Sequence, residues 1–176
     1  MLELYRRGEN VFEALNREHG LDVPITTYLS LYRTHRPRIA LSPGIPALLT
    51  ELKARRCGIG LVTDGRSVTQ RNKIAALRLD TFLSPASVVI SEEFGSSKPD
   101  CANFEYFHRL YPGCRFIYVA DNPQKDFLAP NRLGWRTICL RDDGRNIHSQ
   151  HFDLPTDYLP QTIAETTDQI ISHLNI

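Results

Sequence analysis

The spacing of apolar residues differs between the first 36 residues and the rest of the chain. In the first segment apolar side chains recur at helical spacing, and Gly20 and Pro24 interrupt the pattern. This predicts two helices joined by a short turn. The positions that form the pattern are Leu4, Val11, Phe12, Leu15, Ile25, Tyr28, Leu29, Leu31 and Tyr32.

The remaining sequence alternates between helical patterns and short, wholly apolar runs. A helix over 45–56, ended by Gly58, comes before the alternation. Strands that are apolar throughout and alternate with helices are typical of a parallel sheet covered on both faces, so the sequence predicts a three-layer α/β fold. Strands are expected at 57–63, 87–91, 115–120 and 135–140, and helices at 67–79, 101–111, 124–134 and 161–174.

Composition narrows the class of protein without identifying it. With 176 residues, of which 41% are hydrophobic and 23% charged, the chain resembles one globular domain. The net charge of +1 and the scattered basic residues argue against a nucleic-acid partner and against a membrane surface. The first residues lack an apolar run of signal-peptide length, and no window approaches the roughly 20 apolar residues of a membrane span. A cytoplasmic location is therefore expected.

The cysteines and histidines give little indication of a metal site. The four cysteines are widely spaced and form no CxxC motif, which is typical of reduced, mostly buried thiols. His148 and His151, in the stretch HSQH, have the spacing of metal ligands but no cysteine beside them, which favours a solvated loop.

Polar side chains gather at the predicted carboxyl ends of the strands, where open parallel sheets bind ligands. The first strand ends in LVTDG, with Thr63 and Asp64; Lys98 follows the second strand, and Asp121 and Asp126 follow the third. A hydroxyl, an ammonium and the backbone N–H groups that open helices form a cradle for a dianionic phosphate. Carboxylates at the same edge would repel that phosphate unless a hard cation such as Mg²⁺ lay between them. The combination indicates Mg²⁺-dependent phosphoryl chemistry.

Each of these residues also has a structural interpretation. Thr63 could lie in an ordinary turn, and Lys98 could be a solvated side chain of a polar loop. Asp121 could cap the helix that follows it, and Asp126 could be a surface acid in the first helical turn. The chemical interpretation is favoured because the four residues occur in order, each at the matching end of its element.

The series LVTDG, SSKPD and YVADNPQKDF, followed by LGWRTI, resembles the haloacid dehalogenase superfamily of phosphohydrolases. The resemblance covers essentially the whole chain. It implies that Thr63, with Asp64 and Gly65, binds the transferring phosphoryl group, and that Lys98 neutralises the phosphate. A receiver domain also uses Asp, Thr and Lys, but its phosphorylated Asp precedes both of the others.

The same resemblance implies a cofactor, a substrate class and a domain arrangement. Asp121 would ligate Mg²⁺ and Asp126 would support the metal's shell, in a phosphatase of a small phosphorylated metabolite. The fold would be a Rossmann-like core over 41–176, with a partial helical cap over 1–40 that closes over the site and selects substrates.

The family's first motif, DxDx[TV], has no match before Thr63. That motif carries the nucleophilic Asp at the end of a central strand, which would lie between the strands that end at Thr63 and Ala120. Either those two strands close up directly, or a strand from elsewhere fills the space, or the sequence is an incomplete copy. Without the nucleophile we expect these residues alone not to be a competent phosphatase.

Two other classes of function remain open. The protein could be a pseudoenzyme or a partner subunit that binds phosphate or protein without turnover, as a homo-oligomer or with a partner that donates a strand. A dinucleotide-binding domain is disfavoured, because no GxGxxG follows any predicted strand.

Overall fold

The computed structural model describes residues 3–4, 7–144, 146 and 150–174. None of the described helices has the length and apolar character needed to cross a membrane. The α-helices are α2 (Val11–His19), α3 (Ile25–Thr34), α4 (Ile45–Ala54), α5 (Ser67–Ala76), α6 (Ser91–Phe94), α7 (Ala102–Leu110), α8 (Leu128–Arg132) and α9 (Thr167–Leu174). The strands are β1 (Leu61–Thr63), β2 (Val88–Ile90), β3 (Ile117–Ala120), β4 (Arg136–Leu140) and β5 (Thr162–Ala164), and short 3-10 helices are η1 (Leu79–Thr81), η2 (Pro85–Ser87) and η3 (Thr156–Tyr158).

The described strands form two parallel sheets. In the first sheet, β1 pairs with β2 from Leu61 opposite Val88 to Thr63 opposite Ile90. In the second, β4 lies between β3 and β5 and pairs with both. All of these pairings are parallel, and helices pack on both sides of the strands, which confirms the predicted α/β class.

Within the described residues, β1 and β3 each keep one edge without a strand partner. The orientation of β3 follows from a 3.0 Å hydrogen bond that the N–H of Arg136 donates to the carbonyl of Phe116. Alternate residues of a parallel strand turn their peptide groups to opposite sides, so Tyr118 shares the β4 side with Phe116. The peptide groups of Ile117 and Val119 therefore face the unpaired edge. The two strands expected to flank a missing central strand do not pair with each other.

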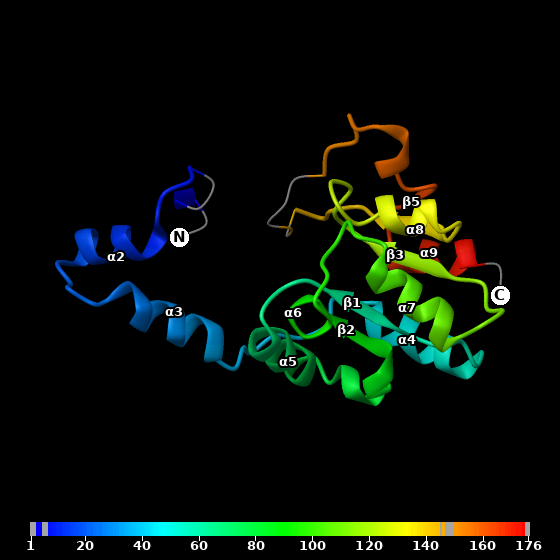
Figure 1. Ribbon diagram of the computed structural model, residues 1–176, viewed down its shortest axis with the longest axis horizontal. Helices are drawn as coiled ribbons and strands as arrows, with labels where there is room; N and C mark the ends of the chain where they lie inside the picture. Colours follow the sequence, from blue (N-terminus) through cyan, green and yellow to red (C-terminus); the bar gives the residue numbers. More distant parts are fainter. Residues whose placement is uncertain (1–2, 5–6, 145, 147–149, 175–176) are drawn as a thin grey trace.

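Helix α7 crosses both sheets on one face of the molecule (Figure 1). Its Phe107 ring packs directly over Gly60, the residue before β1. Its Phe104 ring makes edge-to-face contacts with Tyr118 of β3, at 5.0 Å between centroids, and with Trp135, at 5.4 Å. On the opposite face, α4 and α9 form a second apolar cluster with β4 and β5. The two sheets thus share one helix layer, although no ladder between described strands joins them.

The N-terminal helices α2 and α3 form a hairpin that stands apart from the sheets (Figure 1). The rings of Phe12 and Tyr28 stack at 5.3 Å, and the Tyr28 hydroxyl donates to the Asn16 side chain at 2.7 Å. The hairpin joins the core through α5, where the Asn72 amide donates to the carbonyl of His35 at 3.0 Å. These contacts confirm the predicted helix pair; its role as a cap stays a prediction.

Two predicted helices differ from the structure. The segment 161–174 was expected to be one helix, but its first part is β5, in which β-branched Thr162 and Ile163 pair with β4 and Ala164 is fully buried. The helix expected from 124 begins only at Leu128, because the residues before it form a turn closed by Asn122. Strand pairing thus overrides the helical pattern in the first segment, and a local turn delays the helix in the second.

The end of α4 also differs from the prediction. Arg56, not Gly58, adopts the left-handed conformation, with φ of +58°. The following N–H, of Cys57, donates to the carbonyl of Leu52 at 2.9 Å and closes the helix.

We predict that Gly60→Ala lowers the free energy of unfolding by about 1–3 kcal/mol, because the new methyl would lie 2.6 Å from the buried ring of Phe107. Gly58→Ala is the matched control, since a methyl there meets nothing within 4 Å, and its effect should stay below about 1 kcal/mol. Urea unfolding of both variants measures the difference. Equal midpoints would contradict the close packing of α7 on β1.

Candidate functional site

Three loops meet at the carboxyl ends of the strands, and the Asp64 carboxylate joins them. One oxygen, Oδ1, accepts from the backbone N–H of Lys98 at 3.2 Å. The other, Oδ2, accepts from the Lys125 ammonium at 3.1 Å. The loop after β1 is therefore linked to the loop before α7 and to the loop after β3. This arrangement brings together Asp64 and Lys98, two of the predicted phosphate-binding residues.

A buried ion pair lies below this junction. The Lys98 ammonium is 2.7 Å from Asp126 Oδ1, and the two side chains are only 9% and 4% exposed. The contact is not aligned as a hydrogen bond, since Asp126 Oδ1 has no hydrogen-bond partner within the described structure. Asp126 Oδ2 accepts from the N–H of Asn122 at 3.1 Å. Asp126 is thus engaged by protein groups on both oxygens, which fits a supporting role better than direct metal ligation.

The turn after β3 determines how Asp121 is presented. The Asn122 carbonyl accepts from the N–H groups of Lys125 and Asp126, so the chain turns before α8 starts. Phe127 is the N-cap of α8, which excludes the interpretation of Asp121 as that helix's cap. Asp121 is exposed at the end of β3, and its carbonyl accepts from the Gln150 amide at 2.7 Å.

The predicted phosphate-binding groups after β1 are hydrogen-bonded to protein side chains. The Thr63 hydroxyl donates to Gln70 Oε1 at 3.1 Å, and the Gly65 N–H donates to Ser91 Oγ at 2.9 Å. Gly65 has φ of +136°, and a methyl there would lie 2.7 Å from the Gln70 amide nitrogen. A phosphate at this position would have to replace Gln70 and Ser91 as acceptors of these two bonds.

Two further carboxylates, both on α6, contact the amino end of α5. Glu92 accepts from the Ser67 N–H at 2.7 Å and pairs with Arg66. The hydrogen bond from Ser67, and then that from Arg66, lower the pKa of Glu92 below its ordinary value. Glu93 pairs with Arg71 and accepts from the Ser67 hydroxyl, and both bonds lower its pKa.

Tyr118 is a site residue that the sequence pattern did not single out. Its hydroxyl oxygen accepts from the Lys98 ammonium at 3.3 Å. Burial, followed by the negative charges of Asp126, Asp64 and Asp121, raises the pKa of Tyr118 well above its ordinary value. The available signal was a phenol within the apolar run RFIYVA, three residues before Asp121.

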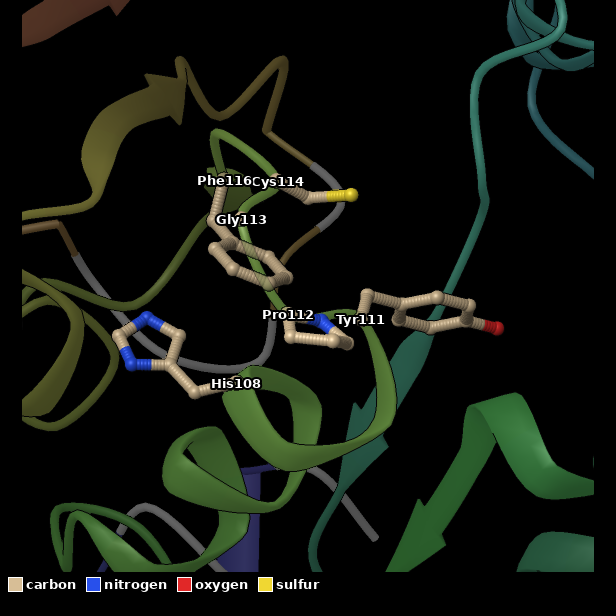
Figure 2. A pocket seen from close by; sticks show the side chains of 6 residues that line it. All are labelled: His108, Tyr111, Pro112, Gly113, Cys114 and Phe116. Atoms are coloured by element: carbon tan, nitrogen blue, oxygen red, sulfur yellow. The ribbon is translucent and has the colours of Figure 1, made fainter.

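A hollow on the molecule lies away from this edge, at the other end of β3 (Figure 2). Its wall comes from the end of α7 and the turn before β3, including His108, Cys114 and Phe116. The exposed His108 is joined to the buried Trp135, because its Nε2 accepts from the Trp135 indole N–H at 2.6 Å. This hollow contains none of the predicted site residues.

The donor groups at the carboxyl edge are compatible with Mg²⁺ held partly by water and substrate oxygens. Among the described residues, no three His, Cys, Asp or Glu side chains converge as metal ligands. Mg²⁺ commonly keeps several waters and uses one or two carboxylates with substrate oxygens, so an exposed carboxylate such as Asp121 suits it. Of the predicted histidine pair, His148 lies outside the described residues.

The parallel sheets and their helices define a Rossmann-like α/β protein. Its polar residues gather at the carboxyl ends of the parallel strands. The chain belongs to the haloacid dehalogenase-like hydrolases, because the profile of that family matches residues 6–140. The resemblance inferred from the motifs is therefore confirmed.

Several proteins of known name are similar to this chain. It is 30% identical over 150 residues to the glyceraldehyde 3-phosphate phosphatase of Methanocaldococcus jannaschii, over 82% of this chain and 63% of that protein. It is 31% identical over 140 residues to the phosphoserine phosphatase of Thermus thermophilus, over 75% of this chain and 53% of that protein. The chain thus spans less than two thirds of the length of these relatives.

Solved structures share the fold. The HAD-hydrolase YfnB from Bacillus subtilis, bound to magnesium, aligns with a TM-score of 0.71 and 20% identity, over 99% of this chain and 77% of that one. The 2-haloacid dehalogenase from Pseudomonas syringae pv. Tomato DC3000 aligns with a TM-score of 0.60 and 23% identity, over 76% of this chain and 53% of that one.

We predict that Asp126→Ala lowers the free energy of unfolding by about 3–5 kcal/mol, because it leaves the Lys98 ammonium buried without its partner. Asp157→Ala is the control: its pair with Arg132 is 3.6 Å long, with side chains 60% and 59% exposed, and should contribute less than about 1 kcal/mol. Guanidinium unfolding compares the two. Similar losses would show that the Lys98–Asp126 pair is not a structural contact of the core.

Proposed function

We propose that the chain is a phosphatase-type domain that binds the phosphate group of a small metabolite, with Mg²⁺, at the carboxyl edge of its sheets. The observation that carries the proposal is the Lys98 ammonium, held at this edge by Asp126. An ammonium placed where a phosphate would sit offsets the charge of that dianion. The names of the two phosphatase relatives support a small phosphorylated substrate.

The residues after β1 would supply the neutral donors. The Thr63 hydroxyl and the Gly65 N–H would turn from Gln70 and Ser91 to the phosphate oxygens. Because these hydrogen bonds are exchanged and not newly created, their net contribution to phosphate affinity is modest. Most of the affinity would come from the charge of Lys98.

We assign Asp121 as the residue that would hold Mg²⁺, with Asp126 kept in place by Lys98. When bound, Mg²⁺ neutralises phosphoryl oxygens and polarises the phosphorus centre. The exposed position of Asp121 after β3 supports this assignment.

We further infer that these 176 residues alone bind phosphate without hydrolysing monoesters at enzymatic rates. The support is the lack of a DxDx[TV] match before Thr63. Loss of a covalent nucleophile typically forfeits about 10⁶ in rate.

Calorimetric titration with inorganic phosphate tests the site. We expect affinity to be at least about tenfold higher in Mg²⁺ than in EDTA, equivalent to about 1.4 kcal/mol. Asp121→Asn should abolish this difference, because it removes the charge assigned to the metal. Asp80→Asn is the control, since Asp80 is an exposed acid in η1, away from the site.

Two results would contradict these expectations. Phosphate binding that ignores both Mg²⁺ and Asp121→Asn would refute the metal assignment. Mg²⁺-dependent release of phosphate from monoesters at ordinary enzymatic rates, abolished by Asp121→Asn, would refute the inferred lack of turnover.

We propose strand addition as a second candidate function, with a partner polypeptide that supplies one parallel strand between β1 and β3. The unpaired edges of these strands support it. Asn103 adds support, because it is fully buried on α7 and neither polar atom of its side chain has a described hydrogen-bond partner. It lies one helical turn from Phe107, which contacts the β1 side, and beside Phe104, which contacts β3. An added strand could bring a partner to this amide, whose unpaired groups cost about 1–3 kcal/mol each.

Amide hydrogen exchange in β3 tests whether this edge is open. In the isolated monomer, the N–H groups of Ile117 and Val119 should exchange at least about tenfold faster than that of Tyr118, because only Tyr118 is directed to β4. An added strand should protect all three. Val119→Pro should weaken the association and preserve the ladder to β4, because proline is tolerated where the N–H points away from the sheet. Uniformly slow exchange in a monomer would contradict an open edge.

A further inference from the structure

The contacts of the Lys98 ammonium indicate that Tyr118 orients its N–H groups. A lysine ammonium is a rotatable group with three N–H donors. Its contact with Asp126 Oδ1 is short, at 2.7 Å, but lacks hydrogen-bond alignment. Its contact with the Tyr118 hydroxyl oxygen, at 3.3 Å, has that alignment. Asp126 therefore supplies charge, whereas Tyr118 supplies a directional acceptor.

The Tyr118 ring is itself held in place by aromatic neighbours. It makes edge-to-face contacts with Phe104 of α7, at 5.0 Å, and with Phe127 before α8, at 6.4 Å. Both phenylalanines are fully buried. Because β3 fixes the backbone and these rings restrict the side chain, the phenol oxygen has a defined position.

The phenol remains neutral at physiological pH. Burial and the nearby carboxylates raise its pKa, so the oxygen keeps its proton while a lone pair accepts from Lys98. A neutral acceptor orients the ammonium without cancelling its positive charge, which a carboxylate in the place of the phenol would do.

We propose that Tyr118 is a positioning residue, which holds the Lys98 ammonium so that an N–H not used by Asp126 or Tyr118 is directed to the phosphate bound at the carboxyl edge. The inference rests on the proposed phosphate site. It adds a residue that touches neither phosphate nor metal and acts only through Lys98.

The test compares Tyr118→Phe with Tyr106→Phe, which also removes a tyrosine hydroxyl hydrogen bond, in this case an exposed one to the carbonyl of Ala86 at 2.8 Å, and which lies on α7. The first readout is the ¹H–¹⁵N signal of the lysine ammonium groups, assigned to Lys98 through Lys98→Met. We expect that signal to broaden or disappear in Tyr118→Phe and to persist in Tyr106→Phe. The second readout is the affinity for inorganic phosphate with Mg²⁺, which should fall about tenfold in Tyr118→Phe alone, the effect of one lost hydrogen bond.

The two readouts separate this inference from the proposed function. An unchanged Lys98 signal in Tyr118→Phe would overturn the positioning role, whatever the affinity. A lost Lys98 signal with equal losses of phosphate affinity in both variants would also overturn it, since the loss would then be a general effect of weakened packing. If the unmodified protein binds no phosphate, the proposed function fails, and the ammonium signal still decides whether Tyr118 orders Lys98.

Discussion

The buried ion pair between Lys98 and Asp126 is the contact on which the carboxyl edge of this protein depends. Lys98 belongs to the loop that leads from the first sheet to α7, and Asp126 to the loop after β3 in the second sheet. No strand ladder joins the two sheets in the described residues, so this pair and the Asp64 contacts connect them at that edge. Two charges so deeply buried are costly to separate, because either one alone would lose its compensation in a medium that hydrates it poorly.

The Lys98–Asp126 pair also determines which site residues are occupied by protein contacts. Asp126 is used by Lys98 and the Asn122 N–H, whereas Asp121, in the same turn, is exposed. The ammonium is thereby fixed at a place where a phosphate would need compensation. Thr63 and Gly65, in contrast, already donate hydrogen bonds to Gln70 and Ser91. Replacing those acceptors by a ligand would therefore add little binding free energy. In the proposed site, the positive charge of Lys98 and the neutral donors Thr63 and Gly65 thus come from different loops.

Much of this arrangement could be predicted from patterns in the chain, for identifiable reasons. Wholly apolar runs between helices indicate parallel strands, and parallel strands bring Thr63, Lys98 and Asp121 to one edge. β5 was missed because Thr162–Ala164 lies directly before a helical pattern, and only pairing with β4 makes it a strand. The orientation of side chains was also beyond prediction. Sequence spacing does not reveal that Gln70 binds Thr63, or that Tyr118, inside an apolar strand, reaches the Lys98 ammonium.

The unpaired edges of β1 and β3 relate the two candidate functions to each other. Parallel strands in one layer end at the same edge, so a strand added between β1 and β3 would finish between Thr63 and Asp121. Its last residues would face the Lys98 ammonium, which favours a carboxylate there through charge attraction. Strand addition and phosphate binding, as proposed, would therefore involve the same edge of the molecule. A strand that ends in a carboxylate would add a candidate nucleophile to the proposed phosphate-binding edge, whereas a strand that ends in an apolar residue would not.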